Sequence, residues 1–216
     1  MWLRSKSIEW LFLAWLVALP VLGGLVQVAM AETNAPAFSL TTTRHELEGI
    51  GHYYRAVATL GTNQLAFIVP KGYFIRLDEQ ARQLRAVERD DKCSITVRLF
   101  SVPTNAVDTA TGELRSAAFR ELLLARHPEA RIVEELTLTA GGAAGPAYDF
   151  VWRTQAGFQL QCRIAFIPTP AGIVEFYLLT SAADKDEFTH ALNTLMLTFR
   201  FGSKGRIELP ELSNKF

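Results

Sequence analysis

The stretch HELEGIGH, residues 45–52, contains the residue types of a zinc site, with two histidines and two glutamates. A zinc-protease helix holds its ion with histidines four residues apart, because positions i and i+4 lie above one another on one helix face. Here His52 follows His45 by seven residues. That offset separates them by about 10 Å on a helix and places them on opposite faces of a strand. We therefore predict no metal site, and expect a solvated approach to the first strand.

The other two histidines, His127 and His190, are candidates for acid–base chemistry. His127 precedes Pro128 at the end of a predicted helix, where a cation near the last carbonyls is favourable. His190 lies at the edge of the apolar stripe of the last predicted helix. No Gly-x-Ser-x-Gly elbow occurs in the sequence, and we predict no catalytic residue set and no cofactor. The alternative is an envelope hydrolase that uses one of these histidines with a carboxylate.

Three aromatic side chains, Tyr148, Phe150 and Trp152, share one face of a predicted strand because they alternate along it. Core packing beneath a helix is one interpretation of this face. The other is an apolar groove for a ligand or a partner peptide. The sequence leaves both interpretations open.

The two cysteines, Cys93 and Cys162, alternate in step with apolar neighbours, which predicts that each points to an apolar face. In an oxidising compartment they could pair if their strands are neighbours. Such a bridge would stabilise the fold by about 4 kcal/mol in the chain-entropy account. Two buried free thiols are the alternative, and the sequence does not decide between the two.

Charge is balanced over the whole chain, with 22 basic and 22 acidic side chains. A near-neutral chain gives no electrostatic case for nucleic acid or for an anionic membrane surface. We therefore predict neither partner, with membrane contact only through an N-terminal segment that stays uncleaved. Within the predicted strands, Asp149 is expected to pair with Arg153 or Arg163 on the same sheet face.

Hydrophobic periodicity divides most of the chain into strands and two helices. Spacings of three and four residues predict helices over 113–126 and 183–196. Alternation and short apolar runs between turn residues predict strands over 53–58, 64–69, 83–88, 92–100, 131–139, 147–154, 157–167, 172–180 and 197–201. Short connections favour antiparallel pairing, and the strand over 172–180, apolar on both faces, is typical of a covered central strand. The predicted fold is α+β, a single antiparallel sheet with helices packed on it in an α/β/α sandwich.

The N-terminal residues have the pattern of a signal peptide. Arg4 and Lys6 precede an apolar run over 10–28, and Ala-Met-Ala ends at residue 31. An uncleaved membrane anchor is the alternative, because the run is about as long as a membrane span. The predicted domains are a signal peptide over 1–31, a flexible leader over 32–50, one α+β domain over 51–201 and a polar tail over 202–216.

Three short motifs resemble one known group of proteins. They are FIVPKGYFI (67–75), GPAYDFVW (145–152) and LTFRF (197–201). Over about residues 64–201 the chain resembles the PsbP/Mog1-like group, which includes bacterial periplasmic PsbP-like and DcrB-like domains. The resemblance implies a non-catalytic binding or accessory role and supplies no catalytic residues. We expect an exported protein, periplasmic or secreted, whose partner is an envelope protein or a small ligand.

Overall fold

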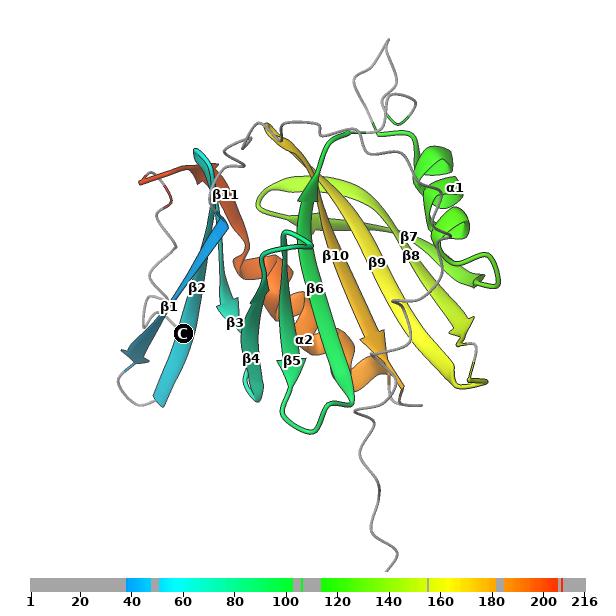
Figure 1. Ribbon diagram of the computed structural model, residues 1–216, viewed down its shortest axis with the longest axis horizontal. Coiled ribbons are helices and arrows are strands. Elements are labelled where there is room, and N and C mark those ends of the chain that lie inside the picture. The colour runs from blue at the N-terminus through cyan, green and yellow to red at the C-terminus, as the bar shows by residue number, and fades with distance from the viewer. Residues whose placement is uncertain are drawn as a thin grey trace, which may run out of the picture. The chain divides into compact units, whose positions relative to one another are not determined.

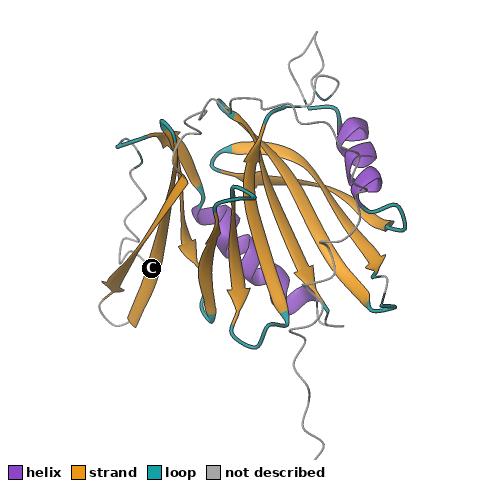
Figure 2. Ribbon diagram, viewed as in Figure 1, coloured by secondary structure: helices purple, strands orange, loops and turns teal. Residues whose placement is uncertain are grey.

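Two antiparallel sheets and two helices make up the computed structural model, which describes residues 38–47, 51–102, 106, 114–154, 156–181, 185–205 and 207 (Figures 1 and 2). All of them belong to one compact unit, Pro36–Phe216. The predicted signal peptide and two thirds of the predicted tail, ten of its fifteen residues, lie outside the described residues. Among the described helices, none is long and apolar enough to cross a membrane.

The smaller sheet has the strand order β1-β2-β3-β11. Its strands are β1 (Phe38–Leu47), β2 (Gly51–Leu60), β3 (Asn63–Val69) and β11 (Arg200–Ser203). The larger sheet has the order β4-β5-β6-β10-β9-β8-β7. Its strands are β4 (Tyr73–Asp78), β5 (Gln83–Glu88), β6 (Cys93–Phe100), β7 (Arg131–Ala140), β8 (Ala143–Arg153), β9 (Gln159–Thr169) and β10 (Gly172–Thr180).

The α+β class is confirmed, but the prediction of a single sheet is wrong. The chain leaves the small sheet after β3, where Pro70 cannot donate a ladder hydrogen bond and Gly72 adopts a positive φ of 87°. The last strand, β11, then returns to pair with β3. Periodicity identifies strands without showing which strands pair, so it could not reveal this division.

The first strand, β1, occupies part of the segment that was expected to be a flexible leader. It pairs with β2 in antiparallel register, with Phe38 opposite Leu60 and His45 opposite Tyr53. Its run of three threonines, 41–43, is β-branched and favours an extended chain. All three are exposed, which is why their composition resembles that of a solvated leader.

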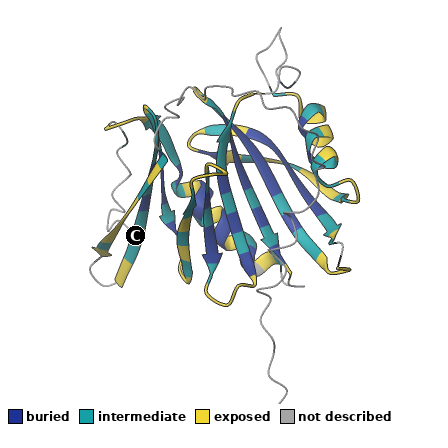
Figure 3. Cartoon of the chain, in the orientation of Figure 1, coloured by how far each residue is buried: buried dark blue, intermediate teal, exposed yellow. Residues whose placement is uncertain are grey.

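A helix packs on each face of the larger sheet, as the apolar residues on both faces of β10 predicted. We call the side that carries Phe176 the rear face and the side that carries Glu175 the front face. On the rear face, α2 (Lys185–Thr198) buries Leu192 and Leu195 in a core shared with both sheets. On the front face, α1 (Ser116–Arg126) buries a second core over β8 and β9. Figure 1 shows α2 behind the sheet and α1 beside β7 and β8, and Figure 3 shows the buried strand residues between them.

Candidate functional site

Four arginines lie on the front face and at its edge, beyond the part that α1 covers. Arg76, Arg85 and Arg98 occupy the polar alternation of β4, β5 and β6, while Arg126 is the last residue of α1. We call these four side chains the arginine face. Rear-facing residues of the same strands are buried, among them Leu84, Ala86, Ile95 and Val97. The strand alternation therefore turns one side of these strands to the core and presents the guanidinium groups on the other.

A buried carboxylate, Glu175 on β10, fixes two of these arginines. Its side chain is only 3% exposed, whereas Arg98 and Arg126 are 31% and 28% exposed. Arg98 lies directly opposite Glu175 in register. Its Nη2 donates a hydrogen bond to Oε2 at 2.9 Å, and its Nε lies 2.8 Å from Oε1 in an ion pair. Arg126 binds Oε2 through Nη1. Two guanidinium groups around one carboxylate leave this site with one net positive charge.

The ring of Phe100 holds the same two guanidinium groups. The Cζ atom of Arg98 lies 5.6 Å from the ring centroid and that of Arg126 lies 5.7 Å from it. Contacts of this length are attractive through the electron-rich face of the ring. The two arginines are thus oriented by a buried acid and an aromatic ring rather than left free to move in solvent.

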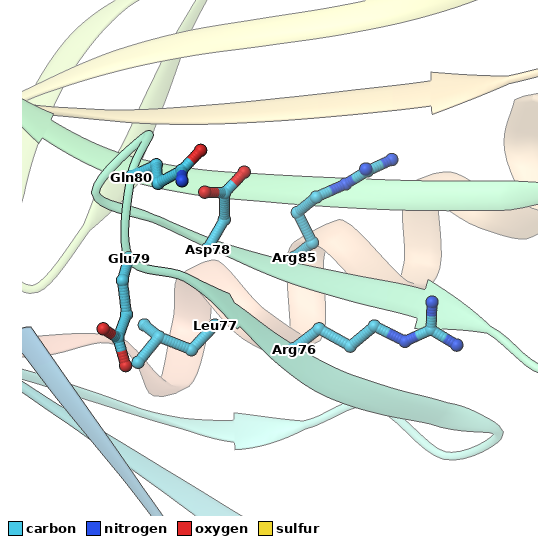
Figure 4. A pocket seen from close by; sticks show the side chains of 6 residues that line it. All are labelled: Arg76, Leu77, Asp78, Glu79, Gln80 and Arg85. Atoms are coloured by element: carbon cyan, nitrogen blue, oxygen red, sulfur yellow. The ribbon is translucent and has the colours of Figure 1, made fainter. Parts of the chain in front are cut away.

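A shallow hollow of about 500 Å³ forms the outer end of the arginine face (Figure 4). It is lined by Arg76, Leu77, Asp78, Glu79, Gln80 and Arg85. Arg76 and Arg85 are directly opposite each other in register. The Asp78 carboxylate accepts hydrogen bonds from the Ala81 N–H at 2.9 Å and from Gln83 Nε2 at 3.3 Å. Its two oxygens therefore hold the turn between β4 and β5.

The predicted aromatic face divides between the core and its rim. Tyr148 and Phe150 are fully buried against α1, and the Tyr148 hydroxyl lies 2.7 Å from Ser116 Oγ. Trp152 is half-buried, and its ring centroid lies 4.9 Å from that of His127. Core packing thus describes the first two residues. A groove at Trp152 stays a prediction.

His127 is packed among aromatic rings. Its ring centroid also lies 5.5 Å from Phe150 and 5.8 Å from Tyr177. Burial lowers the pKa of His127 below its ordinary value, the neighbouring Arg126 lowers it further, and Glu175 partly opposes them. His190 is exposed on α2. In the described part of the chain, no histidine is hydrogen bonded to an Asp or Glu, so no contact there favours the hydrolase alternative.

His45 and His52 lie on opposite faces of the β1–β2 hairpin. The imidazole of His45 stacks on Tyr53 at 5.2 Å, and that of His52 meets Tyr54 edge-on at 5.6 Å. Glu46, not His45, is the cross-strand neighbour of His52. Among the described residues, no group of three or more His, Cys, Asp or Glu side chains is placed to hold a metal ion.

Cys93 and Cys162 are both buried free thiols. They flank β10 on either side, Cys93 opposite Thr180 and Cys162 opposite Leu179, so they point to opposite faces of the sheet. Two strand spacings separate their backbones by roughly 9–10 Å, beyond the reach of a disulfide. The structure thus has the free thiols rather than the bridge. Burial raises the pKa of Cys93 to about 11 and that of Cys162 to about 12.

A second buried acid, Asp149, lies on the rear face and has the predicted partner Arg163. The guanidinium binds both carboxylate oxygens, at 2.6 and 2.7 Å, and Lys185 of α2 binds one of them. Burial by itself raises the pKa of this carboxyl. The hydrogen bonds from Arg163 and Lys185 outweigh that effect and hold the pKa below its ordinary value. The sequence indicated this pair but not the lysine that joins it.

No family model matches the chain, and no curated protein matches it in sequence. Solved structures similar to it include PsbP (CyanoP) of the cyanobacterium Synechocystis, at 12% identity, covering 83% of this chain and 98% of that one, with a TM-score of 0.48. LpqN, involved in cell envelope biogenesis of Mycobacterium tuberculosis, is 12% identical over 75% of this chain and 91% of its own, with a TM-score of 0.45. PA94 of Pseudomonas aeruginosa, of unknown function, is 14% identical over 71% and 95%, with a TM-score of 0.38.

The first of these proteins carries the name of the group that the sequence resembles. At sequence identities of 12 to 14%, the similarity to these structures concerns the fold alone.

Proposed function

We propose that this chain is an exported, non-catalytic accessory protein that binds another envelope protein through its arginine face. The observation that carries the proposal is the buried Glu175, which orients two arginines that remain about 30% exposed on the front of the sheet. A buried ion cluster stabilises a fold no better than apolar packing of the same volume. Because stability alone does not require this carboxylate, its burial beneath two arginines supports a role for the arginines at the protein surface.

The composition of the arginine face also supports binding. Arginine and aromatic residues carry much of the energy of protein interfaces, and lysine and glutamate are depleted there. Phe74 on β4 is 39% exposed on this face, and the guanidinium of Arg76 lies 4.8 Å from its ring centroid. A small ligand instead of a protein is the alternative occupant, and photo-crosslinking distinguishes the two.

Site-specific photo-crosslinking tests the proposal. Phe74→p-benzoyl-phenylalanine places a photoreactive ring on the arginine face with little change in shape. Phe158, which is 57% exposed in the connection between β8 and β9, accepts the same substitution as a matched control. After irradiation of cells that make the full chain, we expect one protein adduct from position 74 and none from position 158.

Equal adducts from both positions, or no protein adduct from position 74, would contradict the proposal. A small molecule attached at position 74, identified by a mass increase below that of a protein, would support the ligand in place of the protein partner.

A further inference from the structure

The free edge of β1 differs from the other edges of the two sheets. Among the described strands, β1, β11, β4 and β7 end the sheets. Proteins protect such edges against pairing with other chains through short strands, bulges, prolines or charged side chains. β11 has four residues, β4 has six, and the ladder of β7 shifts register between Ile132 and Glu134. In contrast, β1 pairs with β2 through all ten of its residues without a shift and contains no proline (Figure 1).

The backbone of β1 presents a regular row of hydrogen-bonding groups on this edge. A two-residue turn joins β2 to β3, so Leu60 and Asn63, which flank it, exchange their backbone hydrogen bonds. Alternate residues of β2 therefore point their backbone groups toward β3. Because Phe38 lies opposite Leu60, the N–H and C=O groups of the even-numbered residues in 38–46 point away from β2. No described strand lies on that side of β1.

The side chains along this edge determine which residues can be added beside them. Phe38 and Leu40 are half-buried and pack against the core that both sheets share. Thr42 and Arg44 continue the same face of the strand and are exposed. The other face carries exposed serine and threonine side chains over 39–43. A strand with apolar residues opposite Phe38 and Leu40 would therefore extend the core past the present edge.

The charges of β1 lie in its second half. Arg44 and Glu46 form an ion pair at 3.1 Å, and their side chains are 54% and 78% exposed. Exposed pairs of this kind contribute little to stability, so both residues can take new partners in a wider sheet at little cost. An acid opposite Arg44 and a lysine opposite Glu46 would form attractive cross-strand pairs.

A second copy of β1 fits this edge less well. Directly opposite side chains share one face of a sheet, so a two-fold ladder between two copies over 38–46 centres on Thr42. That ladder would place Phe38 opposite Glu46 and Leu40 opposite Arg44. Each of these pairs sets an apolar side chain against a charge, so the pattern of β1 favours a strand of different sequence.

We infer that β1 binds an extended segment of another protein, which adds to the small sheet as an antiparallel strand. The backbone of β1 supplies the hydrogen bonds of this pairing. Its side chains select apolar residues opposite Phe38 and Leu40 and an acid opposite Arg44. The arginine face lies on the larger sheet and α1, so this inference concerns a second surface and does not depend on the proposed function.

A nine-residue peptide designed to pair with residues 46–38 is the probe. From its N-terminus, it carries lysine, glutamate, valine, leucine and leucine at alternate positions, with serine between them. Fluorescence anisotropy measures its binding to the full chain. The control peptide has the same sequence with N-methyl groups on the valine and the first leucine. It keeps every side chain and lacks two of the backbone donors that would face β1.

Thr42→Pro removes an outward N–H group from β1, and Thr137→Pro is its matched control. Thr137 is exposed on β7, where the two-residue turn at Gly141 and Gly142 directs its N–H to the free edge in the same way. Both substitutions thus place proline at an edge without removing a ladder hydrogen bond. Thermal melting confirms that both variants fold.

The peptide is expected to bind the unmodified chain and the Thr137→Pro variant equally, and the Thr42→Pro variant at least about tenfold more weakly. The N-methylated peptide should not bind. Arg44→Glu changes an exposed side chain and should weaken binding about fivefold, because it sets two acids opposite each other. A peptide with lysine in place of its glutamate should restore the affinity for this variant.

Absence of peptide binding, or equal binding of the N-methylated peptide, would overturn the inference. Equal binding to the Thr42→Pro variant would also overturn it, and so would an affinity that Arg44→Glu leaves unchanged. If the unmodified chain sediments as a dimer and Thr42→Pro makes it a monomer, a second copy occupies the edge and the inference is wrong. Should Thr42→Pro fail to fold, the two peptides and Arg44→Glu still decide the outcome.

Discussion

Each of the two buried carboxylates attaches one helix to the larger sheet. Glu175 on the front face binds Arg126 at the end of α1, and Asp149 on the rear face binds Lys185 at the start of α2. Each acid also binds an arginine from a neighbouring strand. Taking a charge out of water costs several kcal/mol unless it is paired. Each acid therefore stabilises the fold only while its two cations stay in place.

Asp149→Asn tests this arrangement at the residue scale. The substitution leaves Arg163 and Lys185 without a buried counter-charge, so we expect the free energy of unfolding to fall by about 3–5 kcal/mol. Urea denaturation measures the change. Glu135→Gln breaks the exposed pair with Arg120, which is 50% exposed, and should cost less than about 1 kcal/mol. Similar losses in the two variants would contradict this account of Asp149.

His127 predicts a pH dependence of stability. Its pKa is lowered in the folded protein, so the unfolded chain binds a proton more readily. The contribution of the neutral imidazole is complete above its ordinary pKa of about 6.5 and is lost as the pH falls below that value. His127→Phe keeps a ring among Trp152 and Tyr177 and should remove part of the decrease in stability between pH 7 and pH 5.

Urea denaturation at several pH values measures this effect. His190→Phe is the control, since that side chain is exposed on α2. If the His127 variant loses stability with falling pH as steeply as the unmodified chain, the imidazole is not buried as described.

At the scale of elements, the local sequence pattern predicted where strands and helices lie better than it predicted which strands pair. The predicted strands 83–88 and 172–180 coincide with β5 and β10, because turn residues bound them on both sides. The helix predicted over 183–196 is α2, described from Lys185 to Thr198. The division into two sheets and the strands β1 and β4 were missed. Hairpin spacing does not show where a chain changes sheet, and the exposed threonines of β1 resemble a leader.

Gly145 on β8 shows how closely neighbouring strands approach. A Cβ atom there would lie 1.9 Å from the backbone oxygen of Phe166. Gly145→Ala must therefore displace backbone, and we expect a loss of about 1–3 kcal/mol. Urea denaturation should detect it, together with faster hydrogen exchange in β8 and β9. The control is Ala144→Ser at the exposed preceding residue, and this substitution should change the free energy of unfolding by less than about 0.5 kcal/mol. A neutral Gly145→Ala would contradict the close approach.

At the scale of the whole molecule, the balanced total charge conceals a local excess of positive charge. The chain has equal numbers of basic and acidic residues, yet on the front face two arginines, Arg98 and Arg126, share one buried acid, Glu175. Alternation along the predicted strands 83–88 and 92–100 placed Arg85 and Arg98 at polar positions, whereas no strand was predicted around Arg76. It could not show that these strands are neighbours or that α1 ends beside them, because both depend on sheet order. The candidate site was therefore beyond sequence reasoning.

The central claim is that the arginine face binds another envelope protein. Its most direct test is the photo-crosslink from position 74, repeated in chains that also carry paired arginine substitutions, on the arginine face or away from it. We expect the adduct to disappear with Arg76→Gln and Arg85→Gln, and to remain with Arg131→Gln and Arg153→Gln. An adduct of equal yield in both backgrounds would contradict the claim.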